Sequence, residues 1–449
     1  MRSVEEETVK HTQHLSAGTA IVEVTPKAGV SLGGYPHHPR YNQGVHDPLY
    51  AACLVLDDGV TKAAIVNMDV ISFSKKHVRA VREEVSRRTS IPAGNILISC
   101  SHSHSAPRAS TNFTMDAMEG LQEPDADFVD SLNRKLVSLI VEASAAPFPA
   151  RLGVEKGFCG REQGVGGNRR DPLGLADPEV WTIGVQDLQG TWRAILVKYS
   201  LHPTFLHSDN FLVSADYPGY IRKHLASVAP GAVVLFSLGT CGNQSPRYFR
   251  SGKTFVEAER VGTAIGREAA KVLEKMTLSS QVPLVVKSRE IAIDLRVLPD
   301  RDRAQAAASK ARDEWQAIKA AGAPEPDVWN AELRFLGAED TLSMVLLKEQ
   351  GRLAGIEENL PVEVQVIGIG DARIVGLPGE IFAEFGMTIQ YRAPFGKVFV
   401  VELANGMLPG YAGTTQAYVQ GGYETGASML TGRSGEQMVE AAVQLLCET

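Results

Sequence analysis

The feature that most constrains this chain is an apolar segment that runs directly into two histidines. Residues 95–100 have the composition of a buried β-strand, and His102 and His104 follow at once. Because side chains of an extended segment alternate between two faces, we expect both imidazoles to point the same way. Neutral imidazole is a common zinc ligand, so the pair indicates a metal site. Two hydrogen-bonded surface histidines are the alternative.

Two more apolar segments end in polar loops. Residues 194–201 lead into His202, whose backbone is restricted by the following proline, and residues 232–238 lead into the polar turn 239–246. Glu380 lies in a Gly/Pro turn at the end of a fourth strand and is expected to open a helix over 381–392, where its charge would be stabilised. A helix-terminal charge with no further role is the alternative for Glu380.

The order of periodic segments predicts an α/β (mixed α+β) fold with mixed β-sheets and flanking helices. A strand at 62–68, a helix at 75–88 and the strand at 95–100 predict a parallel crossover unit, whose functional loops lie at the carboxyl ends of its strands. Further helices are expected at 125–145, 217–229, 254–276 and 435–447, and further strands at 18–24, 50–56, 151–158, 179–185, 192–199, 282–298, 362–369, 372–375 and 398–403.

We expect one domain over residues 1–449 with two additions. Residues 1–17 are polar and predict an N-terminal arm. Residues 299–351 are rich in Ala, Arg, Asp, Glu and Lys, with Trp315 and Trp329 as apolar anchors. They predict helical hairpins, either as an insertion or as a small subdomain.

Four loops could form the walls of a site. Residues 34–39 contain His37 and His38, and residues 107–123 are long enough for a rim or lid. The loop 405–423 is rich in glycine and carries three tyrosines, and the loop 160–177 carries three arginines. These are Arg161, Arg169 and Arg170, which could bind a carboxylate or an oxyanion. Solvated loops are the alternative.

Composition excludes several classes of function. The net charge is −7 and there is no basic stripe, so nucleic acid is not expected as a partner. The five cysteines are scattered and odd in number, which argues against disulfides and against a thiolate zinc cluster. We see no signal peptide and no membrane span, and we therefore predict a cytoplasmic protein without a membrane partner. Homo-oligomer formation stays open.

Five motifs in order resemble the neutral ceramidase family, from about residue 18 to the C-terminus. They are residues 101–107 (SHSHSAP), 201–204 (LHPT), 242–246 (GNQSP), 377–380 (LPGE) and the tyrosine-containing loop 411–424. The resemblance implies a zinc amidohydrolase with a neutral-ceramidase-like catalytic domain. It also implies a zinc ion, Zn(2+), held by His102, His202, Glu380 and Tyr411.

The same resemblance implies roles for other residues. His104 would bind the substrate or the reacting oxygen, Tyr423 would stabilise the oxyanion, and Arg161 would bind near the carbonyl, with Arg169 as the next candidate. Ser245 and His37 are further substrate-binding candidates. The chain departs from the family by Asn243 in place of an aspartate, and we expect no C-terminal immunoglobulin-like domain of the kind that ceramidases have. We therefore expect a small soluble amide as the substrate rather than ceramide.

The residues leave four functions open. The first is a zinc-dependent amidase, and the second an esterase or lactonase, because the same site can attack either carbonyl. A non-catalytic zinc-stabilised binding protein is the third. The fourth is a barrel-type amidohydrolase in which both His102 and His104 bind zinc, and the irregular strand spacing argues against it. The sequence has no nucleophile elbow, P-loop or dinucleotide motif.

Overall fold

A computed structural model describes residues 14–110, 124–353 and 359–449. The predicted N-terminal arm (1–17) and the predicted rim (107–123) therefore lie largely outside the described residues. In the described end of the predicted arm, Ser16 already belongs to the first strand, and Leu15 is fully buried.

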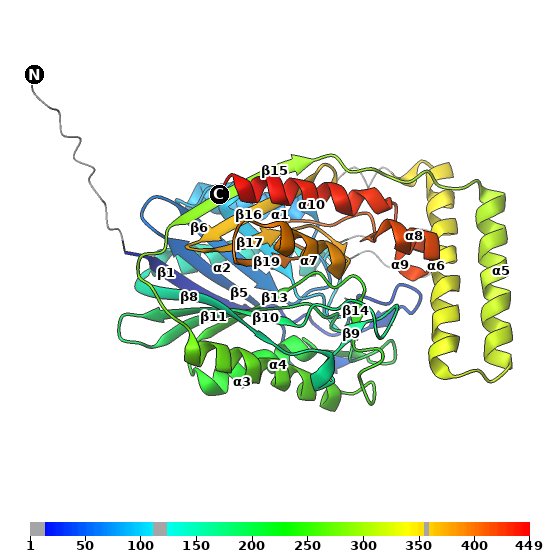
Figure 1. Ribbon diagram of the computed structural model, residues 1–449, viewed down its shortest axis with the longest axis horizontal. Coiled ribbons are helices and arrows are strands. Elements are labelled where there is room, and N and C mark those ends of the chain that lie inside the picture. The colour runs from blue at the N-terminus through cyan, green and yellow to red at the C-terminus, as the bar shows by residue number, and fades with distance from the viewer. Residues whose placement is uncertain (1–13, 111–123, 354–358) are drawn as a thin grey trace, which may run out of the picture.

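Two β-sheets form the centre of the protein, with helices on both outer sides (Figure 1). The larger sheet has the order β13 (Val233–Leu238), β11 (Trp192–Tyr199), β10 (Glu179–Asp187), β8 (Phe148–Phe158), β1 (Ser16–Glu23), β5 (Tyr50–Asp57), β6 (Lys62–Met68) and β7 (Ile96–Cys100). The smaller sheet has the order β15 (Leu284–Ile291), β16 (Val362–Ile369), β17 (Ala372–Gly376) and β19 (Lys397–Val401). This arrangement confirms the predicted mixed fold class.

The two sheets pack face to face through apolar side chains. Trp181 of β10 stacks on Phe399 of β19 with ring centroids 5.4 Å apart, and Leu54 and Ile374 belong to the same buried cluster. Side chains alternate along each strand, so the opposite face of each sheet must also be covered. Helices do this, which produces four layers in the order helix, sheet, sheet, helix.

Amphipathic helices supply the outer layers. In α1 (Lys75–Arg88) the buried residues Val78, Val81 and Val85 recur at helical spacing and join the core of the larger sheet. The larger sheet is covered by α1, α2 (Ala126–Ala145), α3 (Tyr217–Val228) and α4 (Phe255–Lys275), and the smaller sheet by α7 (Ala383–Arg392) and α10 (Gly432–Cys447).

Three strand–helix–strand crossovers place polar loops at corresponding strand ends. They join β6 to β7 through α1, β11 to β13 through α3, and β17 to β19 through α7, and each strand pair is parallel. The first of these units confirms the prediction. The predicted strand 282–298 is shorter in the structure, where β15 ends at Ile291.

The larger sheet curls so that strands from its two ends meet. Asn67 of β6 donates hydrogen bonds to Ser99 Oγ of β7 at 2.5 Å and to Ser237 Oγ of β13 at 3.0 Å. Strands β7 and β13 are the two edges of this sheet, and they are far apart in its hydrogen-bonded order. The curl therefore brings the loops after β7, β11 and β13 to one place.

A helical hairpin projects at one end of the molecule (Figure 1). It consists of α5 (Arg301–Ala320) and α6 (Glu325–Glu349), which confirms the predicted helical hairpin. Helix α6 contacts the short helix α9 (Tyr423–Gly426), which α8 (Thr415–Gln420) precedes. Among the described residues, no helix is both long and apolar enough to cross a membrane.

Short elements complete the loops around the site. The two-residue strands are β2 (Ser31–Leu32), β3 (Arg40–Tyr41), β4 (Gly44–Val45), β9 (Gly167–Asn168), β12 (Leu212–Val213), β14 (Gln244–Ser245), β18 (Glu380–Ile381) and β20 (Tyr411–Ala412), and the 3-10 helices are η1 (Ala93–Asn95) and η3 (Arg161–Gln163). The pairing of β14 with β9 and the pairing of β18 with β20 hold in place the loops that contribute to the site.

Candidate active site and metal centre

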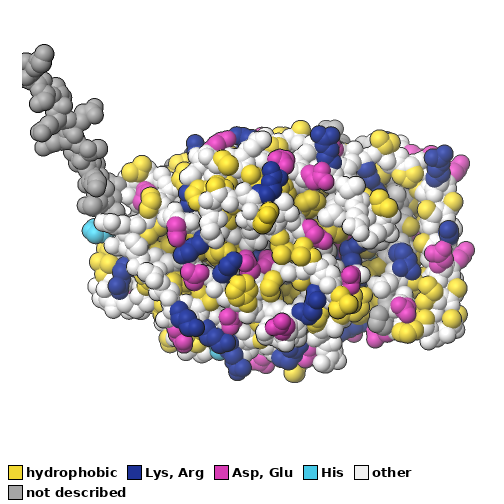
Figure 2. Space-filling model, viewed as in Figure 1, with side chains coloured by type: hydrophobic (Ala, Val, Ile, Leu, Met, Phe, Trp, Pro, Cys, Tyr) yellow, Lys and Arg dark blue, Asp and Glu magenta, His cyan; other side chains and the backbone are white. Residues whose placement is uncertain are grey.

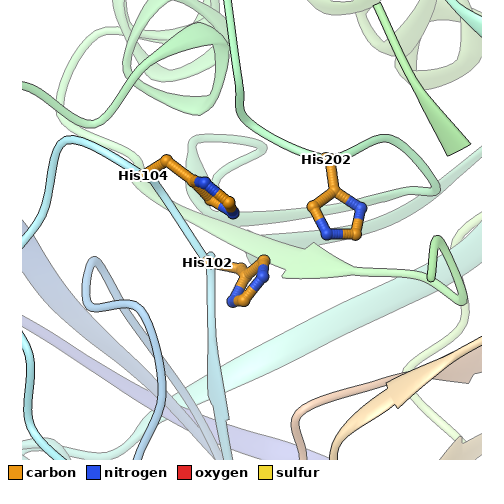
Figure 3. Close-up of side chains that lie close together, drawn as sticks. All are labelled: His102, His104 and His202. Carbon is orange, nitrogen blue, oxygen red and sulfur yellow. The ribbon is translucent and has the colours of Figure 1, made fainter. Parts of the chain in front are cut away.

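Three buried histidines meet where the strand-end loops converge. The ligand atoms of His102, His104 and His202 all lie within 4.8 Å of one another. Figure 3 shows the three imidazoles turned toward a common point, with His102 and His104 from one loop and His202 from another. We call these three residues the histidine cluster. It joins segments that are 98 or more positions apart in the sequence (202 − 104 = 98).

The reason for the convergence of His102 and His104 differs from the predicted one. Strand β7 ends at Cys100, and His102 has the positive φ of 64°. Extended-strand alternation therefore does not orient the pair. Instead, the His102 backbone N–H donates to Val70 O, and that of His104 donates to Pro203 O at 3.2 Å. A non-glycine residue in this conformation costs about 1–2 kcal/mol, which the surrounding buried hydrogen bonds must offset.

Backbone carbonyls fix the tautomers of two histidines. His102 Nδ1 donates to Ile71 O at 2.6 Å, and His202 Nδ1 donates to Cys241 O at 2.7 Å. The Nε2 lone pair of each ring is then directed to the centre of the site. Such a second hydrogen bond is how metal-binding histidines are oriented.

Glu380 completes this arrangement. Its Oε2 lies 3.0 Å from His202 Nε2 and 3.3 Å from His102 Nε2. Three acceptor atoms this close repel one another unless a proton or a cation lies between them. Nitrogen and carboxylate oxygen donors suit zinc, so the residues present fit that ion.

Glu380 does not open a helix, as the sequence analysis expected. Residues Glu380 and Ile381 form β18, which pairs in parallel with Tyr411 and Ala412 of β20, and α7 begins only at Ala383. The prediction was wrong because Glu380 pairs with Tyr411, which lies 31 positions away (411 − 380 = 31), and this pairing gives the segment the structure of a short strand. The same pairing brings Tyr411 beside Glu380, and the Tyr411 and Tyr423 rings lie 6.0 Å apart.

His104 differs from its two neighbours. Neither of its ring nitrogens has a hydrogen-bond partner among the residues that the structure describes, although the side chain is only 7% exposed. Leaving a buried polar atom without a hydrogen-bond partner costs free energy, so the two unpartnered nitrogens indicate that a ligand binds here. The loop 34–39 holds the ring from behind: Tyr35 packs edge-on at 4.9 Å, and a Cβ on Gly34 would lie 2.3 Å from His104 Nδ1.

The arginines of the loop 160–177 are separated by the fold. Arg161 is exposed and donates to Leu173 O and Gly174 O, so the structure places it away from the histidine cluster. Arg169 is the buried one. Its Nε donates to Glu424 Oε1 at 2.8 Å, and its guanidinium lies 5.4 Å from the Tyr411 ring centre. Arg170 also binds Glu424, at 2.7 Å.

Two cavities border the histidine cluster, and His104, Tyr411 and Tyr423 line both of them. The arginine cavity is lined by Arg169, Ser245, Arg247, Arg250, Trp329 and His37, among others. The metal cavity is lined by His102, Glu380, Ser72, Met407 and Asp340, among others. Of the predicted substrate-binding residues, Arg169, Ser245 and His37 thus lie in the arginine cavity.

Burial and charge set the protonation of the site. The pKa of His202 is lowered to about 4, chiefly by burial, and burial together with His102 and His202 lowers the pKa of His104 well below its usual value. Both rings are therefore neutral, as ligands or proton acceptors must be. Burial raises the pKa of Glu380, but the adjacent His102 and His202 outweigh burial and lower that pKa well below its usual value.

The sequence analysis missed several residues at this site. Glu402, fully buried, accepts from Cys241 N at 3.1 Å and Ile381 N at 2.8 Å, and so supports the turns beside His202 and Glu380. Arg247, Arg250 and Asp340 carry no local signal that separates them from surface charges. An acidic residue directly after the apolar strand 397–401 was the available signal for Glu402.

Comparisons with known proteins agree with this fold. A scan of known protein families found no match. Neutral ceramidase A of Dictyostelium discoideum is 24% identical over 253 residues, which are 51% of this chain and 35% of that protein. The neutral ceramidase of Pseudomonas aeruginosa is 22% identical over 245 residues, which are 51% of this chain and 36% of that protein. Its crystal structure superimposes with a TM-score of 0.73 and 19% identity, covering 97% of this chain and 75% of that chain. This protein contains a neutral ceramidase-like domain.

The neutral ceramidase-like domain accounts for nearly all of the described fold. The matched sequence spans about a third of the length of the two curated relatives, whereas the structural match extends over almost the whole chain. A ceramidase structure described as complexed with C2 gives a TM-score of 0.72. The four-layer fold also excludes the (β/α)₈ barrel considered above, because the strands form two separate sheets.

Proposed function

We propose that this protein is a zinc-dependent hydrolase that cleaves an amide (C–N) bond of a small-molecule substrate with water. One observation carries the proposal: two oriented Nε2 atoms and Glu380 Oε2 converge beside the unpartnered ring of His104. The similarity to proteins named as neutral ceramidases supports hydrolysis of an amide bond as the class of reaction.

His102, His202 and Glu380 would hold the zinc ion, with Tyr411 as the fourth ligand. When bound, the ion would lower the pKa of water and polarise the carbonyl of the substrate. Catalytic zinc sites keep a position for water or substrate and can expand to five ligands, so a reactant could join these four residues at the ion. The two adjoining cavities give a reactant access to this position.

The protein's own residues would do the rest. The ring nitrogens of His104 have no hydrogen-bond partner among the described residues, so they would be available to accept a proton from the attacking water and return it to the leaving amine. The pKa of Tyr423 lies well above its usual value, chiefly through burial, so its phenol stays protonated and donates to the developing oxyanion. Arg169 adds positive charge beside Tyr411.

Metal analysis of three proteins tests the ligand set. The wild type and the variants His102→Ala and His104→Ala are loaded with zinc, dialysed and measured by mass spectrometry. We expect one zinc per chain in the wild type, loss in His102→Ala and retention in His104→Ala. Equal loss in both variants would place His104 among the ligands and contradict the assignment.

A substrate panel tests the activity. It contains matched amides, esters and lactones, and His104→Ala is expected to lower turnover by about 10²–10⁴-fold, the usual contribution of a general acid or base. Faster cleavage of esters or lactones would support the esterase alternative. No cleavage by zinc-loaded protein, with zinc raising only the melting temperature, would support a non-catalytic zinc-stabilised binding protein.

A further inference from the structure

The arginine cavity contains two guanidinium groups without a direct ion pair in the described parts of the chain, although the charge of Glu424 acts on Arg247 and that of Asp216 on Arg250. Arg169 forms an ion pair with Glu424, but Arg247 and Arg250 form none within the described parts of the chain. Arg247 Nη1 donates to Arg169 O at 3.0 Å, and Arg250 Nη1 donates to Thr204 O. Both guanidinium groups are thus fixed by backbone carbonyls and retain their charge for a ligand.

Burial makes this charge costly in the absence of a ligand. Burial, reinforced by the charge of Arg169, lowers the pKa of Arg247 to about 10, and burial also lowers the pKa of Arg250. Glu332 lines the same cavity but lies near His38, where burial lowers the pKa of the imidazole and the charge of Glu332 only partly offsets this. A carboxylate bound between Arg247 and Arg250 would offset the cost, because guanidinium groups match carboxylates in geometry and charge.

An apolar wall faces the same cavity. Trp329, Leu333 and Leu336 of α6 line it, and their spacing of four and three residues places them on one helix face. The Trp329 ring is fixed by stacking on His207, with centroids 5.6 Å apart, and Arg250 lies 5.6 Å from its centre. Apolar surface and positive charge are therefore neighbours within one cavity.

The position of the substrate's scissile carbonyl determines which part of the substrate lies in each cavity. His104, Tyr411 and Tyr423 line both, so a carbonyl at these residues has one cavity on each side of the scissile bond. The part of the substrate in the arginine cavity then needs both a carboxylate and an apolar group. An amino acid with an apolar side chain, linked through its nitrogen, has this combination.

We propose that the substrate is an N-acylated apolar amino acid, with its carboxylate on Arg247 and Arg250 and its side chain against Trp329, Leu333 and Leu336. The acyl group extends into the metal cavity. The inference rests on the proposed function. Water oxygen bonds to the acyl carbon, the C–N bond breaks, and the nitrogen takes the proton, which yields a carboxylate and a free amino acid.

Three matched amides test this assignment with zinc-loaded wild type. They are N-acyl-L-leucine, the decarboxylated N-acyl-3-methylbutylamine and N-acylglycine, each prepared with acetyl and octanoyl groups, and the released amine is quantified. We expect kcat/KM for the leucine compound to exceed both others by at least about 10-fold, since a hydrogen bond to a charged group and burial of a leucine side chain each contribute enough for this preference. Equal or faster cleavage of the decarboxylated amide overturns the inference while the hydrolase proposal stands.

Two arginine variants test whether Arg247 and Arg250 cause the preference for a substrate with a carboxylate. Arg247→Gln and Arg250→Gln are expected to reduce the ratio of kcat/KM between the leucine compound and its decarboxylated analogue, mainly through a higher KM. Arg334→Gln removes an exposed charge from the same helix as Trp329 and should leave the ratio unchanged. An unchanged ratio in both cavity variants would refute the carboxylate site.

A binding measurement separates the two proposals. If none of the amides is cleaved, the hydrolase proposal fails, and calorimetry with N-octanoyl-L-leucine decides the substrate site independently. Binding that Arg247→Gln weakens by about 10-fold or more supports the site. Binding that is absent, or that equals binding of the decarboxylated analogue, overturns it.

Discussion

His104 of the histidine cluster and the apolar side chains of α6 line the same arginine cavity, but the fold holds these two groups differently. The histidines are 0–7% exposed, follow strands of the central sheet, and their rings or backbones are bonded to buried carbonyls. The side chains of Trp329, Leu333 and Leu336 are half-buried on a peripheral hairpin, whose contacts with the domain include a small apolar cluster with Leu342 and Met429. We therefore expect reactivity to depend on the histidine cluster and selectivity on the hairpin.

Substitution in the histidine cluster should have the largest effect. His202→Ala removes a fully buried ligand candidate, and we expect loss of bound zinc and at least about 10³-fold lower kcat/KM, equivalent to about 4 kcal/mol. Zinc content and amidase rate are measured together. His46→Ala, at an exposed histidine, is the control and should change neither. Full activity without zinc in His202→Ala would refute a catalytic metal.

The pH dependence of stability tests how firmly the loop after β11 is held. Asp216 is fully buried and accepts from Leu206 N at 3.2 Å, and burial raises its pKa to about 7. The folded state therefore retains a proton that the unfolded state loses above about pH 4, so this contribution to stability is complete below pH 4 and is lost as the pH rises to 7. Over this window the loss is on the order of 4 kcal/mol.

Asp216→Asn should abolish this dependence, because the amide does not titrate. Urea unfolding at several pH values between 4 and 8 measures the slope, and Asp302→Asn at an exposed position provides the control. Parallel slopes in wild type and Asp216→Asn would show that the carboxyl ionises normally and that this loop is not tightly packed.

A change at Gly34 should separate reactivity from metal binding. An added Cβ would overlap His104 at 2.3 Å, so Gly34→Ala should displace that ring and lower kcat about 10²-fold, or about 2.7 kcal/mol, with zinc retained. Gly29→Ala is a matched control in the turn before β2: Gly29 has φ +85° against +89° for Gly34, but nothing lies within 4 Å of its Cβ position. Equal loss in both variants would attribute the effect to backbone strain.

The smallest effect is expected on the hairpin. Trp329→Ala removes apolar surface from the arginine cavity, and we expect about a 10-fold higher KM, equivalent to about 1.4 kcal/mol, with kcat and zinc content unchanged. Trp315→Ala removes the other hairpin tryptophan, which stacks on Phe335 of the hairpin itself. A drop in kcat for Trp329→Ala would mean that the hairpin also positions the reacting groups.

Much of the fold could be predicted because its signals are local. Helix α1 agrees with its predicted range residue for residue, and α2 and α4 agree to within one residue at each end, since apolar spacing and capping residues act over a few positions. The turn at Glu380 was predicted wrongly because its structure depends on Tyr411, which local pattern cannot supply. Metal ligation and the catalytic roles remain predictions.

The sequence by itself determined which strands end in reactive loops and which residue types those loops carry. The tertiary structure alone decided that these loops meet, because the curl of the larger sheet and the link from Asn67 to Ser237 act across 170 positions. It also distinguished Arg169 from Arg161, which the sequence could not do. The partner that buries Arg169 is Glu424, 255 positions away, and only packing of the complete chain places that carboxylate beside one arginine rather than the other.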